Sequence, residues 1–375
     1  MERTETNSAG NGGKRQLSVI DISKKGRQKF RARRYQEARD LFREGLEREP
    51  DNPYLLSGMG DACRETGEFE DAERCYRHLL EIDKRNLFAL RGLGDVCKKM
   101  SRHQEAIRLW NEYLALRPRD KHVMTRIADS CKALLQFDKA EEAYNQIIKL
   151  DPSDRFALTG MADLQHRLGN DEKAIEYYEN VLQFDPNELH ILTIIGKLCW
   201  RTNDFEKAER YFRRALSIDP HNPYALYGLG NCFRWPHQYD KAIEIWGEIL
   251  KHNEGTQALY TRMGDAHVHL GDNEKAEASY LKAMEVGEDP FAVSGLVRLY
   301  CERRDWPQAA TFFWKLMVDE DDALNKIEEL TKRFVRSGQR EIMLTFFSFL
   351  LDSKQGQPLV VNELNGLVAR LTDES

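Results

Sequence analysis

The sequence predicts an all-α protein built from tandem antiparallel helix pairs, and three features that recur along its 375 residues predict it. A short stretch rich in glycine and alanine recurs every 34 residues, at 58–63, 92–97, 126–131, 160–165, 194–199, 228–233 and 262–267. An alanine recurs with the same step, at Ala38, Ala72, Ala106, Ala140, Ala174, Ala208, Ala242 and Ala276, and Ala309 follows after 33 residues. Four residues beyond each alanine stands an aromatic residue: Phe42, Tyr76, Trp110, Tyr144, Tyr178, Phe212, Trp246, Tyr280 and Phe313. A fixed period of this length is typical of stacked helix–turn–helix units.

The glycines in these stretches could instead suggest chemistry. The copy "GLGDVC" at 92–97 looks like a phosphate-binding glycine loop beside a reactive cysteine. A phosphate loop follows a strand and offers free backbone amides, and a catalytic loop is rarely repeated at a fixed period. We therefore predict that Gly94 is a packing position in the middle of a helix. Cys97 is then a core residue one turn further on.

Residues 53–86 show how one unit is expected to fold. A first helix, 53–66, has one apolar stripe with the spacing i, i+3, i+4 and i+7, formed by Leu56, Met59, Gly60 and Cys63. Asn52 before Pro53 predicts the start of this helix, and Gly67 predicts its left-handed end. A second helix, 69–82, has a stripe of Phe69, Ala72, Tyr76 and Leu79. One pair cannot bury both of its faces, so neighbouring pairs must stack.

The pattern resembles the tetratricopeptide repeat (TPR) family in period and in residue type: Leu then Gly or Ala in a first helix, then Ala, an aromatic residue and Pro in a second. The closing prolines here are Pro50, Pro118, Pro152, Pro186 and Pro220. Nine repeats are predicted within residues 18–322, with boundaries near 19, 53, 87, 121, 155, 189, 223, 257 and 290. The resemblance implies a right-handed superhelical solenoid of antiparallel helix pairs, whose first helices line a concave groove.

Both ends of the chain depart from the repeat. Residues 1–17 are rich in Gly, Ser, Asn and Thr and are predicted to be disordered. The basic stretch 24–34 is either a solvated polar cap or a patch that docks an acidic partner or an anionic surface. Residues 323–375 are predicted to form a divergent helix pair plus a C-terminal capping helix. Their apolar cluster is expected to be buried, or alternatively to form a homodimer interface; it consists of Phe346, Phe347, Phe349 and Leu350.

Composition narrows the class of protein. The net charge of −6 argues against nucleic acid as the main partner. No apolar run reaches the roughly 18 residues that a membrane helix needs, and the first residues lack the apolar region of a secretory signal. We therefore expect no membrane span and a cytoplasmic location. The seven cysteines are interpreted as small core residues rather than as a disulfide framework.

The groove that the resemblance implies would be lined by first-helix residues that packing leaves free. The predicted partner-binding residues are Tyr54, Phe88, His122, Phe156, His190, Trp200, Arg201, Tyr224, Tyr227, Arg234, Trp235 and Phe291. We expect those from Trp200 to Trp235 to converge, because Trp, Tyr and Arg dominate interface hot spots. In the alternative, Trp200 and Trp235 pack between neighbouring helices.

A row of carboxylates on the same helices has two interpretations. Its members are Asp61, Asp95, Asp129, Asp163 and Asp265. They could face a partner, or they could pair with bases three or four residues further along their own helices, such as Arg64 after Asp61. Some family members clamp a C-terminal carboxylate with Lys and Asn. This chain has Ser, Thr and Asp in the matching positions, so we do not expect that clamp.

No arrangement typical of catalysis is found in the sequence. His267 and His269 lie two residues apart on a predicted helix, so their rings point in different directions, and a Cys-x-x-Cys pair is absent. We predict no catalytic residue, metal or cofactor. The leading hypothesis is a scaffold that binds a peptide or helix of a partner protein in its groove. The alternatives are a regulatory or targeting subunit of a separate enzyme complex and a nucleic-acid-binding helical-repeat protein, against which the aspartates argue.

Overall fold

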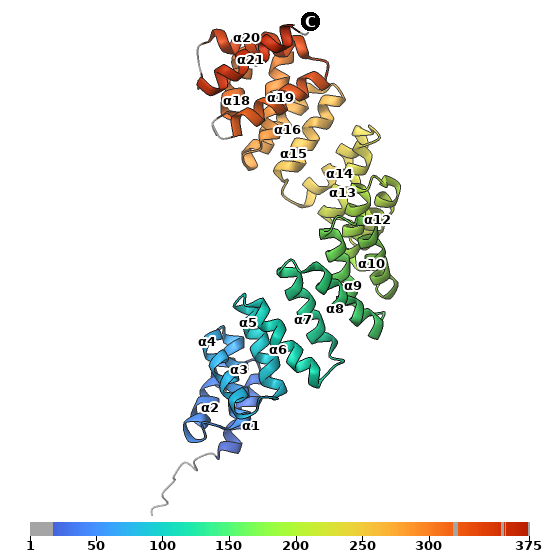
Figure 1. The fold of residues 1–375 in the computed structure, drawn as a ribbon. Helices are drawn as coiled ribbons and strands as arrows, with labels where there is room; N and C mark the ends of the chain where they lie inside the picture. The colour runs from blue at the N-terminus through green and yellow to red at the C-terminus, as the bar shows by residue number, and fades with distance from the viewer. Residues whose placement is uncertain (1–17, 318–321, 354–355, 357, 374–375) are drawn as a thin grey trace, which may run out of the picture. The chain divides into compact units, whose positions relative to one another are not determined.

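The computed structural model describes residues 18–317, 322–353, 356 and 358–373, and these residues form 21 α-helices and no strand (Figure 1). The all-α prediction is therefore confirmed. The chain divides into two compact units, residues 1–184 and residues 185–375. Each unit is described by itself below. The predicted disordered segment 1–17 lies outside the described residues.

The first unit contains ten helices arranged as five consecutive pairs. They are α1 (Val19–Arg31), α2 (Tyr35–Arg48), α3 (Pro53–Thr66), α4 (Phe69–Ile82), α5 (Leu87–Lys99), α6 (His103–Leu116), α7 (Lys121–Ala133), α8 (Phe137–Leu150), α9 (Arg155–Arg167) and α10 (Asp171–Phe184). The two helices of a pair pack against each other, and first helices also contact across pairs, as α3 does with α1 and α5.

The second unit continues the same alternation of first and second helices. Its helices are α11 (Leu189–Arg201), α12 (Phe205–Ile218), α13 (Pro223–Arg234), α14 (Tyr239–His252), α15 (Gln257–His269), α16 (Asn273–Val286), α17 (Pro290–Glu302), α18 (Trp306–Leu316), α19 (Ala323–Arg336), α20 (Arg340–Asp352) and α21 (Pro358–Asp373).

Most first helices begin at a side-chain cap. The side chain of Asn52 accepts hydrogen bonds from the backbone N–H groups of Tyr54 and Leu55, and Pro53 occupies the first turn. Asn86, Asp120, Asp154, Asn222, Thr256 and Asp289 cap later first helices in the same way. Such caps satisfy backbone donors that the helix itself leaves unpaired, which fixes where each pair starts.

Each first helix ends at one residue with left-handed backbone geometry. Gly67 has a φ of 83°, as its type predicts, and Gly169 and Gly271 repeat it. Residues other than glycine adopt the same geometry at this repeat position elsewhere: Arg33, Ser101, Leu135, Asn203, His237 and Arg304. The Trp235–Pro236 sequence replaces the usual glycine turn, and the left-handed residue there is His237.

The core explains the glycines and aromatics that mark the repeat. A Cβ atom added to Gly94 would lie 2.3 Å from Nε1 of Trp110, and one added to Gly60 would lie 2.8 Å from the Tyr76 ring. Both rings are fully buried. The glycines therefore let each first helix approach the large ring of its partner helix, and "GLGDVC" is architecture.

The C-terminal helices α19, α20 and α21 pack together and close the second unit. Phe346 and Phe347 are fully buried, Leu350 is 1% exposed, and Phe349 is half-buried. The ring of Phe346 lies 5.8 Å from that of Phe313 on α18, edge to face. This burial leaves little exposed phenylalanine surface for a homodimer contact.

Candidate functional site

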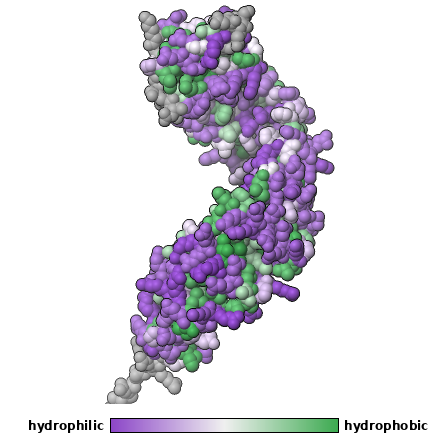
Figure 2. Space-filling view, viewed as in Figure 1, coloured by the Kyte–Doolittle hydropathy of each residue, from purple (hydrophilic) through white to green (hydrophobic). Residues whose placement is uncertain are grey.

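The first helices present a row of exposed rings near their N-terminal ends. Tyr54, Phe88 and Phe156 are 69%, 61% and 69% exposed in the first unit, and Tyr224 and Phe291 are 77% and 55% exposed in the second. His122 and His190, at the same repeat position, are also exposed. We call the surface formed by these residues, and by the residues that follow them on the same helix faces, the A-face. Figure 2 shows hydrophobic residues at the surface of a mainly hydrophilic molecule.

The aspartates of the A-face bind to the second helices. The Tyr76 hydroxyl donates a hydrogen bond of 2.7 Å to Asp61, and Tyr144 and Tyr280 do the same to Asp129 and Asp265 at 2.7 Å. Tyr178 also donates to Asp163. In each case the tyrosine lies 15 residues after the aspartate. These carboxylates are therefore structural fasteners within a helix pair, and burial of the rings raises the pKa of the tyrosines.

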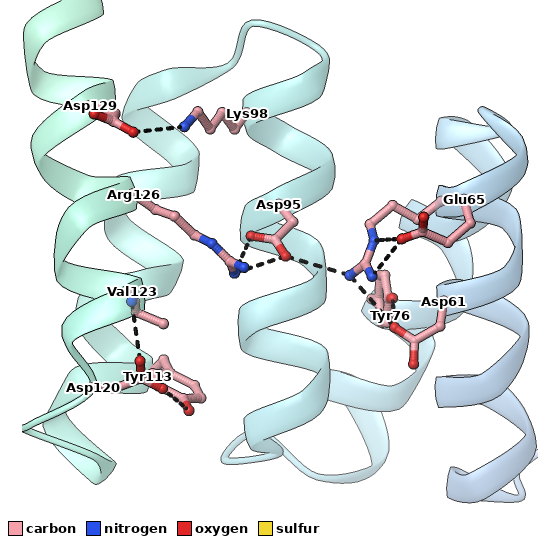
Figure 3. Close-up of polar contacts among 11 residues, drawn as sticks. Asp61, Glu65, Tyr76, Asp95, Lys98, Tyr113, Asp120, Val123, Arg126 and Asp129 are labelled. Carbon is pink, nitrogen blue, oxygen red and sulfur yellow. Dashed lines mark hydrogen bonds and ion pairs between the residues drawn. The ribbon is translucent and has the colours of Figure 1, made fainter. Parts of the chain in front are cut away.

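Asp95 is the exception, because the residue 15 positions later is Trp110, which has no hydroxyl group. Its carboxylate oxygens lie 2.7 and 2.9 Å from the Arg126 guanidinium on α7 and 3.5 Å from that of Arg64 on α3 (Figure 3). Burial raises the pKa of Asp95, while Arg126 and Arg64 oppose that change. Asp95 thus links three successive first helices.

A hollow lies beside Phe88 at the N-terminal end of α5. Its volume is about 670 Å³, and its lining includes Leu87, Phe88, Arg91 and Tyr113. The Tyr113 hydroxyl donates a hydrogen bond of 2.8 Å to Asp120, the cap of α7, and that bond fixes one wall. An exposed ring beside an open hollow and an exposed arginine is an arrangement that can receive a side chain of a partner.

Two of the residues predicted to converge in the second unit lie against one ring that sequence reasoning missed. Trp200 packs edge to face on Phe205 with 6.4 Å between ring centroids, and Trp235 packs on the same ring at 5.3 Å. Trp235 remains 57% exposed, whereas Trp200 is half-buried with Nε1 buried and unpaired. The packing alternative therefore describes Trp200 better than Trp235.

The remaining predicted residues of the second unit lie along α13, apart from the exposed Arg201. Tyr224 is exposed at the start of the helix, while Tyr227 is half-buried and accepts a hydrogen bond from Nε of Arg262 on α15. The Arg262 guanidinium lies 5.6 Å from the centroid of the Tyr227 ring. Arg234 is half-buried; burial and the nearby Arg262 lower its pKa. Phe291 on α17 is covered on one side by Arg333, at 5.0 Å from its centroid.

Metal-binding side chains are sparse in the described part of the chain. Cys63, Glu68 and Asp71 bring one ligand atom each within 4.8 Å. Burial raises the pKa of the Cys63 thiol to about 12, and Glu68 is already paired with Arg39, so these groups fit a packed helix end better than an ion. His267 is buried, whereas His269 stacks on Tyr239 with 4.5 Å between centroids. The seven cysteines are free, and six of them are buried.

None of the described helices is both long and apolar enough to cross a membrane.

The helix pairs, their 34-residue step and the exposed first-helix face define a class of helical repeat proteins. Models described as tetratricopeptide repeat match residues 29–93 and 200–245, residues 154–221, and residues 122–154 and 258–288. The chain belongs to the tetratricopeptide repeat family. No curated protein matches it.

Solved structures of tetratricopeptide repeat proteins share the fold. One is the C-terminal part of a TPR repeat-containing protein from Cytophaga hutchinsonii, with 19% identity and a TM-score of 0.53, covering 63% of this chain and 97% of that one. MamA has 23% identity and a TM-score of 0.42, covering 44% and 91%. YrrB, a TPR protein with an unusual peptide-binding site, has 19% identity and a TM-score of 0.42, covering 49% and 95%.

Proposed function

We propose that the protein is a non-catalytic scaffold whose A-face binds a peptide or a helix of a partner protein. The observation that carries the proposal is the row of exposed rings at one repeat position, Tyr54, Phe88 and Phe156, on first helices of the first unit. Burying an exposed ring removes a large apolar area from water, and aromatic residues are enriched at interface cores. Rings at a regular spacing suit an extended or helical ligand.

The same geometry disfavours a catalytic role for the A-face. Four of its aspartates accept hydrogen bonds from tyrosines, and Asp95 pairs with two arginines. Burial raises the pKa of Cys97 to about 11, so this thiol stays protonated at neutral pH. Groups that are engaged or protonated in this way make poor general bases and nucleophiles.

Three narrower expectations belong to the same proposal. The partner can itself be an enzyme, in which case the chain is the regulatory or targeting subunit. A cytoplasmic location remains a prediction from the sequence. A homodimer through the C-terminal helices also remains a prediction, and the buried positions of Phe346 and Phe347 do not favour it.

The experiment compares two triple variants of the full chain. Tyr54→Ala, Phe88→Ala and Phe156→Ala together remove the rings of the first unit. Ile82→Ala, Leu150→Ala and Phe184→Ala remove side chains that are 46%, 45% and 58% exposed at the ends of second helices, and they form the matched control. Proteins recovered from extracts of the native cell by each immobilised variant are identified by mass spectrometry.

We expect at least one protein to be recovered by the wild type and the control and lost from the ring variant. Circular dichroism should show equal helicity for all three, because the exposed rings contribute little to the core. Equal recovery by the two variants would contradict the proposal.

A further inference from the structure

Cations on the A-face of the first unit are neutralised by its aspartates. Arg64 lies within 3.6 Å of Asp61 and 3.5 Å of Asp95, and Lys98 lies 3.6 Å from Asp129. Lys132 lies 4.0 Å from Asp129 and 3.9 Å from Asp163. Each cation therefore has a carboxylate from its own helix, from the next first helix or from both. This wall has little charge to offer a ligand.

The A-face of the second unit breaks this pattern. The four positions that correspond to the aspartates are Lys197, Asn231, Asp265 and Arg298. Only Asp265 remains a carboxylate, and it is engaged by the Tyr280 hydroxyl. Within the described part of the chain, Arg234, Arg262 and Arg298 form no ion pair with any carboxylate, and Nε of Arg298 is buried without a hydrogen-bond partner.

One local comparison shows what has changed. Arg126 lies 31 residues after Asp95 and pairs with it, beside the buried ring of Trp110. Arg262 lies 31 residues after Asn231, beside the buried ring of Trp246. The second unit therefore repeats the surroundings of the first with a neutral amide in place of the carboxylate. The Oδ1 atom of Asn231 is buried and unpaired, and Arg262 turns to the hydroxyl of Tyr227.

Aromatic surface accompanies these arginines. Tyr224 and Tyr227 precede Arg234 by ten and seven residues on α13, so the three share one side of the helix. The exposed Trp235 follows Arg234 directly, although it packs toward Phe205. Arginines without carboxylate partners beside exposed rings are suited to a ligand that carries both carboxylates and apolar groups.

We propose that the A-face of the second unit binds an acidic peptide segment, whose carboxylates pair with Arg234, Arg262 and Arg298. This inference rests on the proposed scaffold function and names its ligand chemistry. A short acidic peptide fits better than a nucleic acid, because the cations without partners are confined to a few neighbouring helices while the whole chain carries a net charge of −6. A long polyanion would meet repulsion beyond this cluster.

The test selects random dodecapeptides displayed on phage against the full-length protein and measures the affinity of the enriched peptides by fluorescence anisotropy. Asn231→Asp restores the missing carboxylate, and Arg234→Gln with Arg262→Gln removes two cations. Arg210→Gln, on an exposed residue of α12 outside the A-face, is the charge-matched control for a lost cation. Urea denaturation checks that each variant is folded.

We expect enriched peptides to carry two or more Asp or Glu residues. Asn231→Asp and the double variant should each weaken binding at least tenfold, the scale expected when a hydrogen bond between charged groups is lost, while Arg210→Gln stays within twofold. Higher salt should weaken binding further.

Three results would overturn the inference. They are enrichment of neutral or basic peptides, acidic peptides whose affinity is unchanged in both A-face variants, and a single-stranded oligonucleotide that displaces the peptide and binds more tightly. An absence of enrichment relative to the double variant counts against it equally. None of these results alters the outcome for the ring variant of the first unit, so failure here is distinguishable from failure of the scaffold function.

Discussion

Leu135 adopts a backbone conformation that suits glycine. Its φ is 58°, in the left-handed region, where a Cβ atom is unfavourable, and its side chain is 70% exposed. Substitution by glycine removes the steric cost and sacrifices little burial. We expect Leu135→Gly to raise the free energy of unfolding by about 1 kcal/mol, measured by urea denaturation.

Gly67→Ala provides the converse at the same repeat position. The φ of Gly67 is 83° and no atom lies near enough to hinder a new Cβ, so only backbone strain acts. We expect a loss of about 1 kcal/mol. A destabilised Leu135→Gly together with an unaffected Gly67→Ala would show that the left-handed turn is not a strained position.

At the scale of the element, one hydrogen bond fastens each helix pair that contains an Asp and a Tyr 15 residues apart. A double-mutant cycle on Asp129→Ala and Tyr144→Phe should give a coupling energy of about 1 kcal/mol, since the bond joins a hydroxyl to a partly exposed carboxylate. Combining Asp61→Ala with Tyr144→Phe uses the same substitutions on residues of different pairs. That cycle should be additive within about 0.5 kcal/mol. Coupling of equal size in both cycles would mean that the hydrogen bond is not its source.

The helix pairs could be predicted from the sequence because each depends on local spacing. Gly94, Trp110 and the caps such as Asn52 act within one pair, and the structure places them as expected. The partner of Asp95 could not be predicted in this way. Arg126 belongs to the next pair, and its reach depends on how closely the pairs stack.

The candidate site was predictable to a similar depth. The exposed rings of Tyr54, Phe88 and Phe156 follow from their repeat position. The role of Phe205 did not, although aromatic residues at Phe69 and Phe137 share its place in the repeat. Its contact with Trp200 and Trp235 depends on side-chain directions at two helix ends, which the spacing alone does not fix.

At the scale of the whole molecule, buried tyrosines make stability depend on alkaline pH. Burial, followed by the neighbouring aspartates, raises the pKa of Tyr76 and Tyr280, and burial likewise raises those of Tyr144 and Tyr178. An unfolded tyrosine ionises near pH 10. The stabilisation from each buried tyrosine is therefore complete below about pH 10. It falls as the pH rises above that value, by up to about 1.4 kcal/mol per pH unit.

We expect the free energy of unfolding to decline above about pH 10 and the decline to be shallower in Tyr144→Phe. Denaturation by urea between pH 8 and pH 11 measures both. Absorbance of tyrosinate at 295 nm should rise for these residues only as the helices are lost. An unchanged slope in the variant would show that Tyr144 ionises equally in both states.

Asp95 also affects the order in which the array unravels from its N-terminal end. Helix-pair arrays can lose terminal pairs one at a time, since each pair contacts only its neighbours. Detaching α3 breaks the contact of Arg64 with Asp95, but Arg126 still neutralises that carboxylate. Detaching α5 next would separate Asp95 from Arg126 as well. Fraying from this end is therefore expected to slow at α5, which shields the helices that follow from proteases acting on loosened termini.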